Sequence, residues 1–175
     1  THCRGCSCIS STHVILWSQA GWQSGRLLDT NTPIAEKKTY MDVVISEYKE
    51  YNHNEIIALY KSVGWTNYLE HPERLKEGYK NSLCVLAAYH DAEVVGILRA
   101  VGDGATILFI QDIIVLPKYQ RMGIGTKLIT SALKKYEDVY QIELLTDNTE
   151  KAISFYKSAG LTPANEIGAL SFIRM

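Results

Sequence analysis

The sequence predicts a single α/β domain of the α+β kind, with a mixed and mostly antiparallel central sheet flanked by helices. Three observations predict this fold. The chain has 175 residues, 46% of them hydrophobic, which is enough for one sizeable core. From residue 41 onward the patterns run strand, helices, antiparallel strands, then strand, helix, strand, helix, strand. Residues 105–116 are nearly all apolar, as in a central strand covered on both faces.

The first elements follow from residue type and spacing. Residues 43–45 have the β-branched composition of a strand. Asn52 is placed to cap a helix whose apolar residues are spaced to bury one face, and Gly64 is placed to end it. Residues 65–68 are aromatic and polar, which predicts a loop. A short helix is expected over residues 72–79, with a proline in its first turn.

The middle of the chain predicts three strands. Residues 83–89 and 93–101 are apolar runs joined by a short link, which predicts a hairpin. Residues 102–104 read Gly-Asp-Gly and form a second turn. The buried strand over residues 105–116 follows, and Pro117 ends it.

The last third alternates helix and strand. Helices are expected over residues 123–136 and 149–159, with Gly160 ending the second. A strand is expected over residues 142–145, and a last strand over residues 169–173.

Charge and hydropathy exclude several classes of protein. The formal net charge is −1, which argues against a general nucleic-acid binder. No apolar run approaches the ~18 residues that a membrane span needs. We therefore expect no nucleic-acid partner and no membrane association.

Residues 1–40 differ from the rest of the chain and hold three of the four cysteines: Cys3, Cys6 and Cys8. A zinc site would need four well-placed ligands in a folded frame, and this segment lacks any sustained helix or strand period. We expect no metal site and interpret the segment as a leader foreign to the domain. The functional domain is then residues 41–175, whose only cysteine, Cys84, lies in an apolar strand. A buried reduced thiol fits a cytoplasmic protein.

The chemically informative motif is Gln-Arg-Met-Gly-Ile-Gly at residues 120–125, after the buried strand and before a helix. Two glycines one residue apart let a ligand approach the backbone. The free amides and positive dipole of a helix start favour an anion such as phosphate or pyrophosphate.

Three other interpretations of the motif compete. A dinucleotide-binding fingerprint requires a third glycine where Leu128 stands. A nucleotide P-loop requires Gly-Lys-Ser or Gly-Lys-Thr, whereas Gly125 is followed by Thr126 and Lys127. A glycine-rich turn without a ligand is the third alternative.

The context favours a different family. The Gln-x-x-Gly-x-Gly motif after a strand is followed about thirty residues later by Phe-Tyr-Lys-Ser-Ala-Gly at residues 155–160. This combination resembles the GCN5-related N-acetyltransferase (GNAT) superfamily over residues 109–161, and the upstream elements fit the same fold. The resemblance implies acetyl-CoA as cosubstrate, and small members of the family often form dimers, so a homodimer is also expected.

The resemblance also implies where the cofactor binds. Backbone amides of residues 121–126 would hold the pyrophosphate, and the strand edge at residues 113–115 would pair with the pantetheine arm. Members of the family often have an asparagine just before the later helix. This sequence has Thr149 at that position, with Asn148 one residue earlier. The residues expected to bind the cofactor are Ile113, Ile114, Val115, Gln120, Arg121, Met122, Gly123, Ile124, Gly125, Thr126 and Asn148.

Tyr156 and Asp112 are the expected catalytic residues. The resemblance implies that Tyr156 protonates the departing thiolate as general acid, although it also lies on the apolar stripe of its helix and could serve only the core. Many relatives carry a glutamate or histidine where Gln111 stands, so the usual base is missing. Asp112 is the next candidate if a bulge turns it toward the site. A structural role for Asp112 and proton loss through water are the alternatives.

The acceptor is expected to be a small-molecule amine that contacts Trp65, Tyr68 and Gln111. Aromatic side chains there would suit an ammonium group before its deprotonation. A protein lysine or N-terminus is an alternative acceptor, and a non-catalytic acyl-CoA-binding module is an alternative function.

Overall fold

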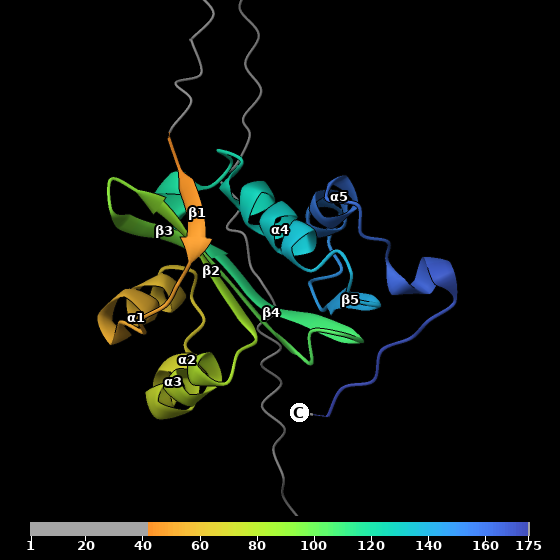
Figure 1. Cartoon of the computed structure of the whole chain (residues 1–175), viewed down its shortest axis with the longest axis horizontal. Coiled ribbons are helices and arrows are strands. Elements are labelled where there is room, and N and C mark those ends of the chain that lie inside the picture. Colours follow the sequence, from red (N-terminus) through yellow and green to blue (C-terminus); the bar gives the residue numbers. More distant parts are fainter. Residues whose placement is uncertain (1–41, 175) are drawn as a thin grey trace, which may run out of the picture.

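The computed structural model describes residues 42–174, and it is a five-stranded sheet with helices on both faces (Figure 1). The expectations for Cys3, Cys6, Cys8 and Met41 fall outside these residues. The predicted mixed α/β class is confirmed. Within residues 42–174, no helix has the length and apolarity to cross a membrane, and no three His, Cys, Asp or Glu side chains group as metal ligands would.

The strands are ordered β1-β2-β3-β4-β5 along the sheet. The first three neighbouring pairs are antiparallel and β4 pairs with β5 in parallel, so the sheet is mostly antiparallel as predicted. The strands are β1 (Val44–Glu47), β2 (Cys84–His90), β3 (Glu93–Gly102), β4 (Ile107–Val115) and β5 (Gln141–Leu144).

Helices cover both faces of this sheet, and the 3-10 turns η1 and η2 follow β4 and α5. Asn52 caps α1 as predicted, because its side-chain oxygen accepts from the amide of Asn54 at 3.1 Å. Gly64 follows α1 in the left-handed conformation, with φ +77°. The elements are α1 (His53–Ser62), α2 (Asn67–Glu70), α3 (Pro72–Lys80), η1 (Pro117–Tyr119), α4 (Ile124–Lys135), α5 (Glu150–Ser158) and η2 (Ala164–Ile167).

Two expectations about the elements are wrong. Residues 65–68 are predicted as loop, but residues 67–68 begin the short helix α2, which packs between α1 and α3. Residues 169–173, predicted as a last strand, have no regular secondary structure and join no strand within the described part of the chain. Their residue pattern suits a strand, but a strand also needs a partner, and these residues pair with none in the described chain.

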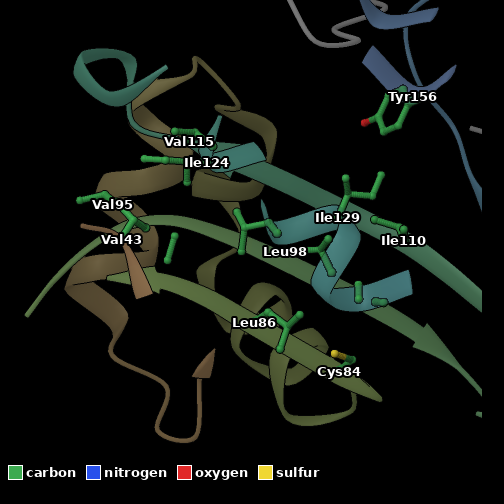
Figure 2. Close-up of a cluster of buried hydrophobic side chains, with 14 of the residues drawn as sticks. Val43, Cys84, Leu86, Val95, Leu98, Ile110, Val115, Ile124, Ile129 and Tyr156 are labelled. Atoms are coloured by element: carbon green, nitrogen blue, oxygen red, sulfur yellow. The ribbon is translucent and has the colours of Figure 1, made fainter. Parts of the chain in front are cut away.

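Two clusters of buried apolar side chains fill the space between sheet and helices. One lies under α4 and α5, where Figure 2 shows Leu86 and Leu98 on the strands and Ile129 on α4. The other lies under α1–α3 and is centred on Ile56 and Tyr60. The sheet is thus covered on both faces, which explains why β4 is nearly all apolar.

A bulge in β4 decides which way its polar residues point. Arg99 pairs with Asp112 and Ala100 pairs with Ile110, which leaves Gln111 as the extra residue. In a regular strand, Ile110 and Asp112 would lie on the same face of the sheet, because they are two residues apart. The bulge instead places Ile110 under α4 and turns Asp112 to the face covered by α1–α3. The predicted irregularity is present, but it turns Asp112 into the core.

Candidate active site

The sheet opens between β4 and β5. Their ladder runs from Ile107 paired with Gln141 to Ile110 paired with Leu144, and no pair follows. The edge of β4 at residues 113–115 is therefore free on the β5 side and lines a cavity of about 750 Å³. Free backbone groups on a strand edge can pair with an extended ligand.

The loop between β4 and α4 forms one end of this cavity. Gly123 has φ +81° and is the N-cap of α4, so the first amides of the helix face the cavity without partners inside the helix. A Cβ on Gly125 would lie 3.3 Å from the Phe155 ring, so glycine allows α4 and α5 to approach. Gln120 donates from Nε2 to the Val115 carbonyl oxygen at 2.9 Å, which ties the loop to the end of β4.

The cavity is electrostatically suited to an anion. Its described lining contains the cations Arg121 and Lys151 and no carboxylate. Burial lowers the pKa of Lys151, and repulsion from Arg121 lowers it further, so the two charges share one environment. Together with the helix start of α4, they make this end favourable for phosphate groups.

Tyr156 lies further along the same cavity. Its ring is 9% exposed and belongs to the core cluster under α5, at whose edge Figure 2 shows it. Burial raises the pKa of Tyr156, the neighbouring Thr146 side chain opposes this increase, and the charge of Asp147 adds to it. Tyr156 therefore both packs the core and presents a hydroxyl that is protonated at neutral pH.

Asp112 does not line this cavity. Its Oδ2 accepts a hydrogen bond from the Tyr60 hydroxyl at 2.7 Å and from Arg99 Nε at 2.5 Å. The Asp112 residue is 2% exposed and Arg99 is 7% exposed, so this is a buried ion pair. The Tyr79 hydroxyl extends the network by donating to Tyr60 at 3.3 Å. These contacts favour the structural role for Asp112 over that of a general base.

Comparison with known proteins agrees with this geometry. The sequence matches the profile of the Acetyltransferase (GNAT) family over residues 43–161. The chain belongs to this family. Its members are acetyl-transferring enzymes, and the family's donor is acetyl-CoA.

Similar proteins are found in bacteria. The chain is 29% identical to the "uncharacterized N-acetyltransferase ycf52-like" protein of Prochlorococcus marinus, over 83% of this chain and 87% of that one. A GNAT-family acetyltransferase of Streptococcus pneumoniae is 36% identical, with a TM-score of 0.70 over 77% of this chain and 98% of that one. A Bacillus subtilis acetyltransferase solved in complex with CoA shares the fold at 20% identity, with a TM-score of 0.55 over 68% of this chain and 76% of that one.

Three of the residues predicted to bind the cofactor in this GNAT acetyltransferase do not have side chains in the cavity lining. Met122 is 46% exposed and outside the cavity lining, and Ile124 is buried in the core, so either could serve a ligand only through its backbone. Asn148 is exposed and also outside the lining, because Thr149 is the residue that caps α5, accepting from the Ala152 amide at 3.3 Å.

Of the residues expected to bind the acceptor, the structure brings Trp65 to the cavity. Trp65 lines it and contacts Tyr60 edge to face, with ring centroids 5.7 Å apart. Tyr68 lies behind Trp65 at a centroid distance of 6.0 Å. Burial raises the pKa of Tyr68, and a side-chain hydrogen bond with Gln111 opposes the increase. Tyr68 thus supports the Trp65 ring, which lines the cavity, and Gln111 supports Tyr68.

Several cavity residues escaped the sequence analysis. Lys151, Ala152, Phe155 and Tyr156 line the cavity from one face of α5, and only the last two belong to the recognised motif. Lys151 could have been found from its spacing, because residues four apart share a helix face. Thr146, Ser62 and Val63 carry no such signal, since only the fold brings the end of α1 and the segment after β5 to the same cavity.

Proposed function

We propose that this GNAT acetyltransferase transfers the acetyl group of acetyl-CoA to the primary amine of a small molecule, directly and within a ternary complex. The observation that supports this is the continuity of the cavity. The start of α4 with its cations, the free edge of β4, Tyr156 and Trp65 all line one cavity. In this proposal they take the pyrophosphate, the pantetheine arm, the thioester and the acceptor respectively.

In this proposal the backbone does most of the cofactor binding. Amides of residues 121–126 hold the pyrophosphate, and Arg121 and Lys151 add positive charge to the same end. The free edge of residues 113–115 hydrogen-bonds to the amide groups of the pantetheine arm. The side chain of Gln120 contributes by holding the loop against β4.

The chemical step is a nucleophilic attack on the thioester. The neutral amine attacks the acetyl carbonyl carbon, and the nitrogen of the tetrahedral intermediate loses a proton to water. The intermediate then collapses to the amide and the C–S bond breaks. Tyr156 donates its phenolic proton to the departing CoA thiolate and regains a proton from water. Its raised pKa suits this role, because the hydroxyl must carry its proton at neutral pH.

The amine loses its proton to water in this proposal. No carboxylate lines the described part of the cavity, and Asp112 is engaged by Arg99 and Tyr60 behind it. An ammonium group has no free lone pair, so deprotonation must precede attack. Ser62, in the lining near Trp65, offers a hydroxyl that can hydrogen-bond a water molecule on this route.

The aromatic side chains around Trp65 favour a small amine over a protein as the acceptor. Trp65 is fixed by Tyr60 and Tyr68, and its ring can hold an ammonium group by a cation–π contact before deprotonation. No acidic side chain lines the described cavity, so a polybasic peptide finds no complementary charge there.

The test combines binding and turnover. Calorimetry first establishes acetyl-CoA binding, and thiol release is then measured with a panel of small amines and with lysine-containing peptides. Tyr156→Phe should lower kcat on the order of 10²-fold or more with acetyl-CoA affinity unchanged. Tyr136→Phe is the matched control, because it removes a hydroxyl outside the cavity lining, which donates to the Leu83 carbonyl at 3.3 Å and also interacts with the Cys84 thiol. Release with peptides alone would overturn the small-amine acceptor, and binding without any release would favour a non-catalytic module.

A further inference from the structure

The described chain holds a second cavity, which shares no lining residue with the cavity of the candidate active site. Its volume is about 720 Å³. It lies where the segment after β1, helix α3, the start of β2 and the end of α4 meet, and its lining comes from residues 47–51, 73–80 and 82–85, with Lys135. The proposed acetyl transfer uses none of these residues, so the second cavity is free to serve a different ligand.

The side chains that line the second cavity carry an excess of positive charge. Four lysines and three glutamates contribute to the lining, which leaves one net positive charge. Each glutamate has a basic partner: the pairs are Glu47 with Lys135, Glu77 with Lys80 and Glu73 with His71. Lys49 and Lys76 take part in no ion pair within the described chain. This balance suits a ligand with a single negative charge, because the carboxylates would repel a polyanion.

The hydroxyl of Tyr51 is the unsatisfied hydroxyl of this lining. It is buried and has no hydrogen-bonding partner in the described chain. The other lining hydroxyls donate to acceptors: Tyr48 to Glu55, Tyr79 to Tyr60 and Ser82 to the Gly78 carbonyl. Burial raises the pKa of Tyr51, so its hydroxyl keeps its proton and is a donor at neutral pH. A buried donor without an acceptor costs free energy, which a ligand oxygen would recover.

Aromatic and aliphatic side chains provide an apolar part of the same lining. The Tyr79 ring contacts the rings of Tyr51 and Tyr48 edge to face, with centroids 5.3 and 6.5 Å away. From the start of β2, Leu83 is exposed and Val85 is half-buried. A few polar groups beside apolar surface are typical of a small-molecule site, and here they suit a ligand with an apolar body and one charged end.

We propose that the second cavity binds a small organic anion, a monocarboxylate with an apolar or aromatic body. The carboxylate accepts a hydrogen bond from the Tyr51 hydroxyl and is attracted by Lys49 and Lys76, while the body packs against Tyr79 and Leu83. Lys49 and Lys76 are exposed, and exposed side chains change rotamer within nanoseconds, so they can move to admit the ligand to Tyr51. This proposal does not depend on the acetyl acceptor.

The first test is a titration with phenylacetate, an aromatic monocarboxylate, followed by NMR. A ligand of this size is expected to bind with a Kd on the order of 1 mM. Phenylacetamide has nearly the same shape without the charge and should bind about 10-fold more weakly or less. The absence of phenylacetate binding well above this concentration would overturn the proposal, and equal binding of the amide would overturn the anionic class of the ligand.

The second test removes the groups that would hold the carboxylate. Tyr51→Phe keeps the ring and removes the donor, so it should weaken phenylacetate binding about 10-fold. The same variant should unfold at an equal or higher urea concentration than the wild type, because it removes an unsatisfied buried hydroxyl. Lys49→Ala and Lys76→Ala should each raise the Kd about 2–5-fold. Unchanged binding in Tyr51→Phe, or its earlier unfolding, would contradict the role given to this hydroxyl.

Two control variants exclude other sites for the anion. Lys134→Ala removes the same charge from an exposed position on α4 outside the lining, and phenylacetate binding should change less than about twofold. A loss as large as that in Lys76→Ala would indicate a general charge effect and would overturn the site. Arg121→Ala removes a cation of the active-site cavity and should leave phenylacetate binding unchanged. Weaker binding in Arg121→Ala, or competition between phenylacetate and acetyl-CoA, would place the anion in the active-site cavity and would overturn the proposal.

Discussion

Arg121 is the position where backbone strain and cofactor binding can be separated by mutation. It has φ +67° within the loop before α4, and a residue other than glycine in this left-handed region costs about 1–2 kcal/mol. Glycine there removes the strain but adds about 0.5–1 kcal/mol of conformational entropy to the unfolded chain. Arg121→Gly should therefore stabilise the fold by about 0.5–1 kcal/mol, which is about 1–4 °C in Tm for a chain of this size.

The same substitution should weaken acetyl-CoA binding. It removes one of the two cationic side chains in the cavity, and a partly exposed contact of this kind is worth about 0.5–1 kcal/mol. The Kd for acetyl-CoA should therefore increase about 2–5-fold. Fold stability and affinity thus change in opposite directions, which a general loosening of the structure cannot produce.

Two further variants separate the causes. Arg121→Ala removes the charge but keeps a side chain with φ > 0, so it should lose affinity to the same extent and gain no stability. Ala92→Gly relieves a φ of +67° in the hairpin between β2 and β3, so it should gain about 0.5–1 kcal/mol and keep its affinity. Urea unfolding and calorimetry measure the two quantities. Equal unfolding free energies for Arg121→Gly and Arg121→Ala would refute the strain argument, and unchanged affinity in both would refute the role of the charge.

Two other predictions concern buried polar groups. In the proposed mechanism Tyr156 works as an acid while it is protonated, so kcat should fall only as pH rises through its raised pKa. Because Thr146 lowers that pKa, Thr146→Val should move the fall in kcat to still higher pH, and Thr146→Ser should restore the wild-type profile. A pH profile that is the same in all three proteins would remove Thr146 from the environment of Tyr156. Asp112→Asn leaves the Arg99 charge buried without its counter-charge and should destabilise the fold by about 3–5 kcal/mol in urea, whereas the double variant Arg99→Met/Asp112→Leu should recover most of that loss. A single variant as stable as the wild type would contradict the buried ion pair.

Much of the fold was predictable because local signals and tertiary packing agree. Asn52, Gly64 and Pro117 mark element boundaries through their own chemistry, so no distant contact is needed to place them. The helix over residues 67–70 has one turn and no caps of its own, and it forms only because α1 and α3 lie on either side. Residues 169–173 show the opposite failure, since their pattern is that of a strand but they pair with no strand of the described chain.

The parts of the candidate site that come from one continuous segment of backbone were predictable from the sequence. The parts that depend on which residues pair across the sheet were less predictable. The glycine loop, the free edge of β4 and Tyr156 follow from one contiguous motif and one helix. The partner of Asp112 does not, because Arg99 lies 13 residues earlier and its register depends on the bulge. A polar pair in an apolar strand signals an irregularity but not the face to which each residue turns.

The bulge also explains why the cavity opens at this point of the sheet. The β4–β5 ladder ends at Ile110 paired with Leu144, and the next residue of β4 is the bulged Gln111. A bulge bends its strand and increases its twist, so β4 diverges from β5 immediately beyond it. Asp112 follows the bulge and pairs with Arg99 across the β3–β4 ladder, so their buried ion pair fixes the bend from the opposite face. The ion pair of Asp112 therefore supports the free edge of β4 from behind, and the Asp112 side chain lies outside the lining of the cavity in which the acetyl transfer is proposed to occur.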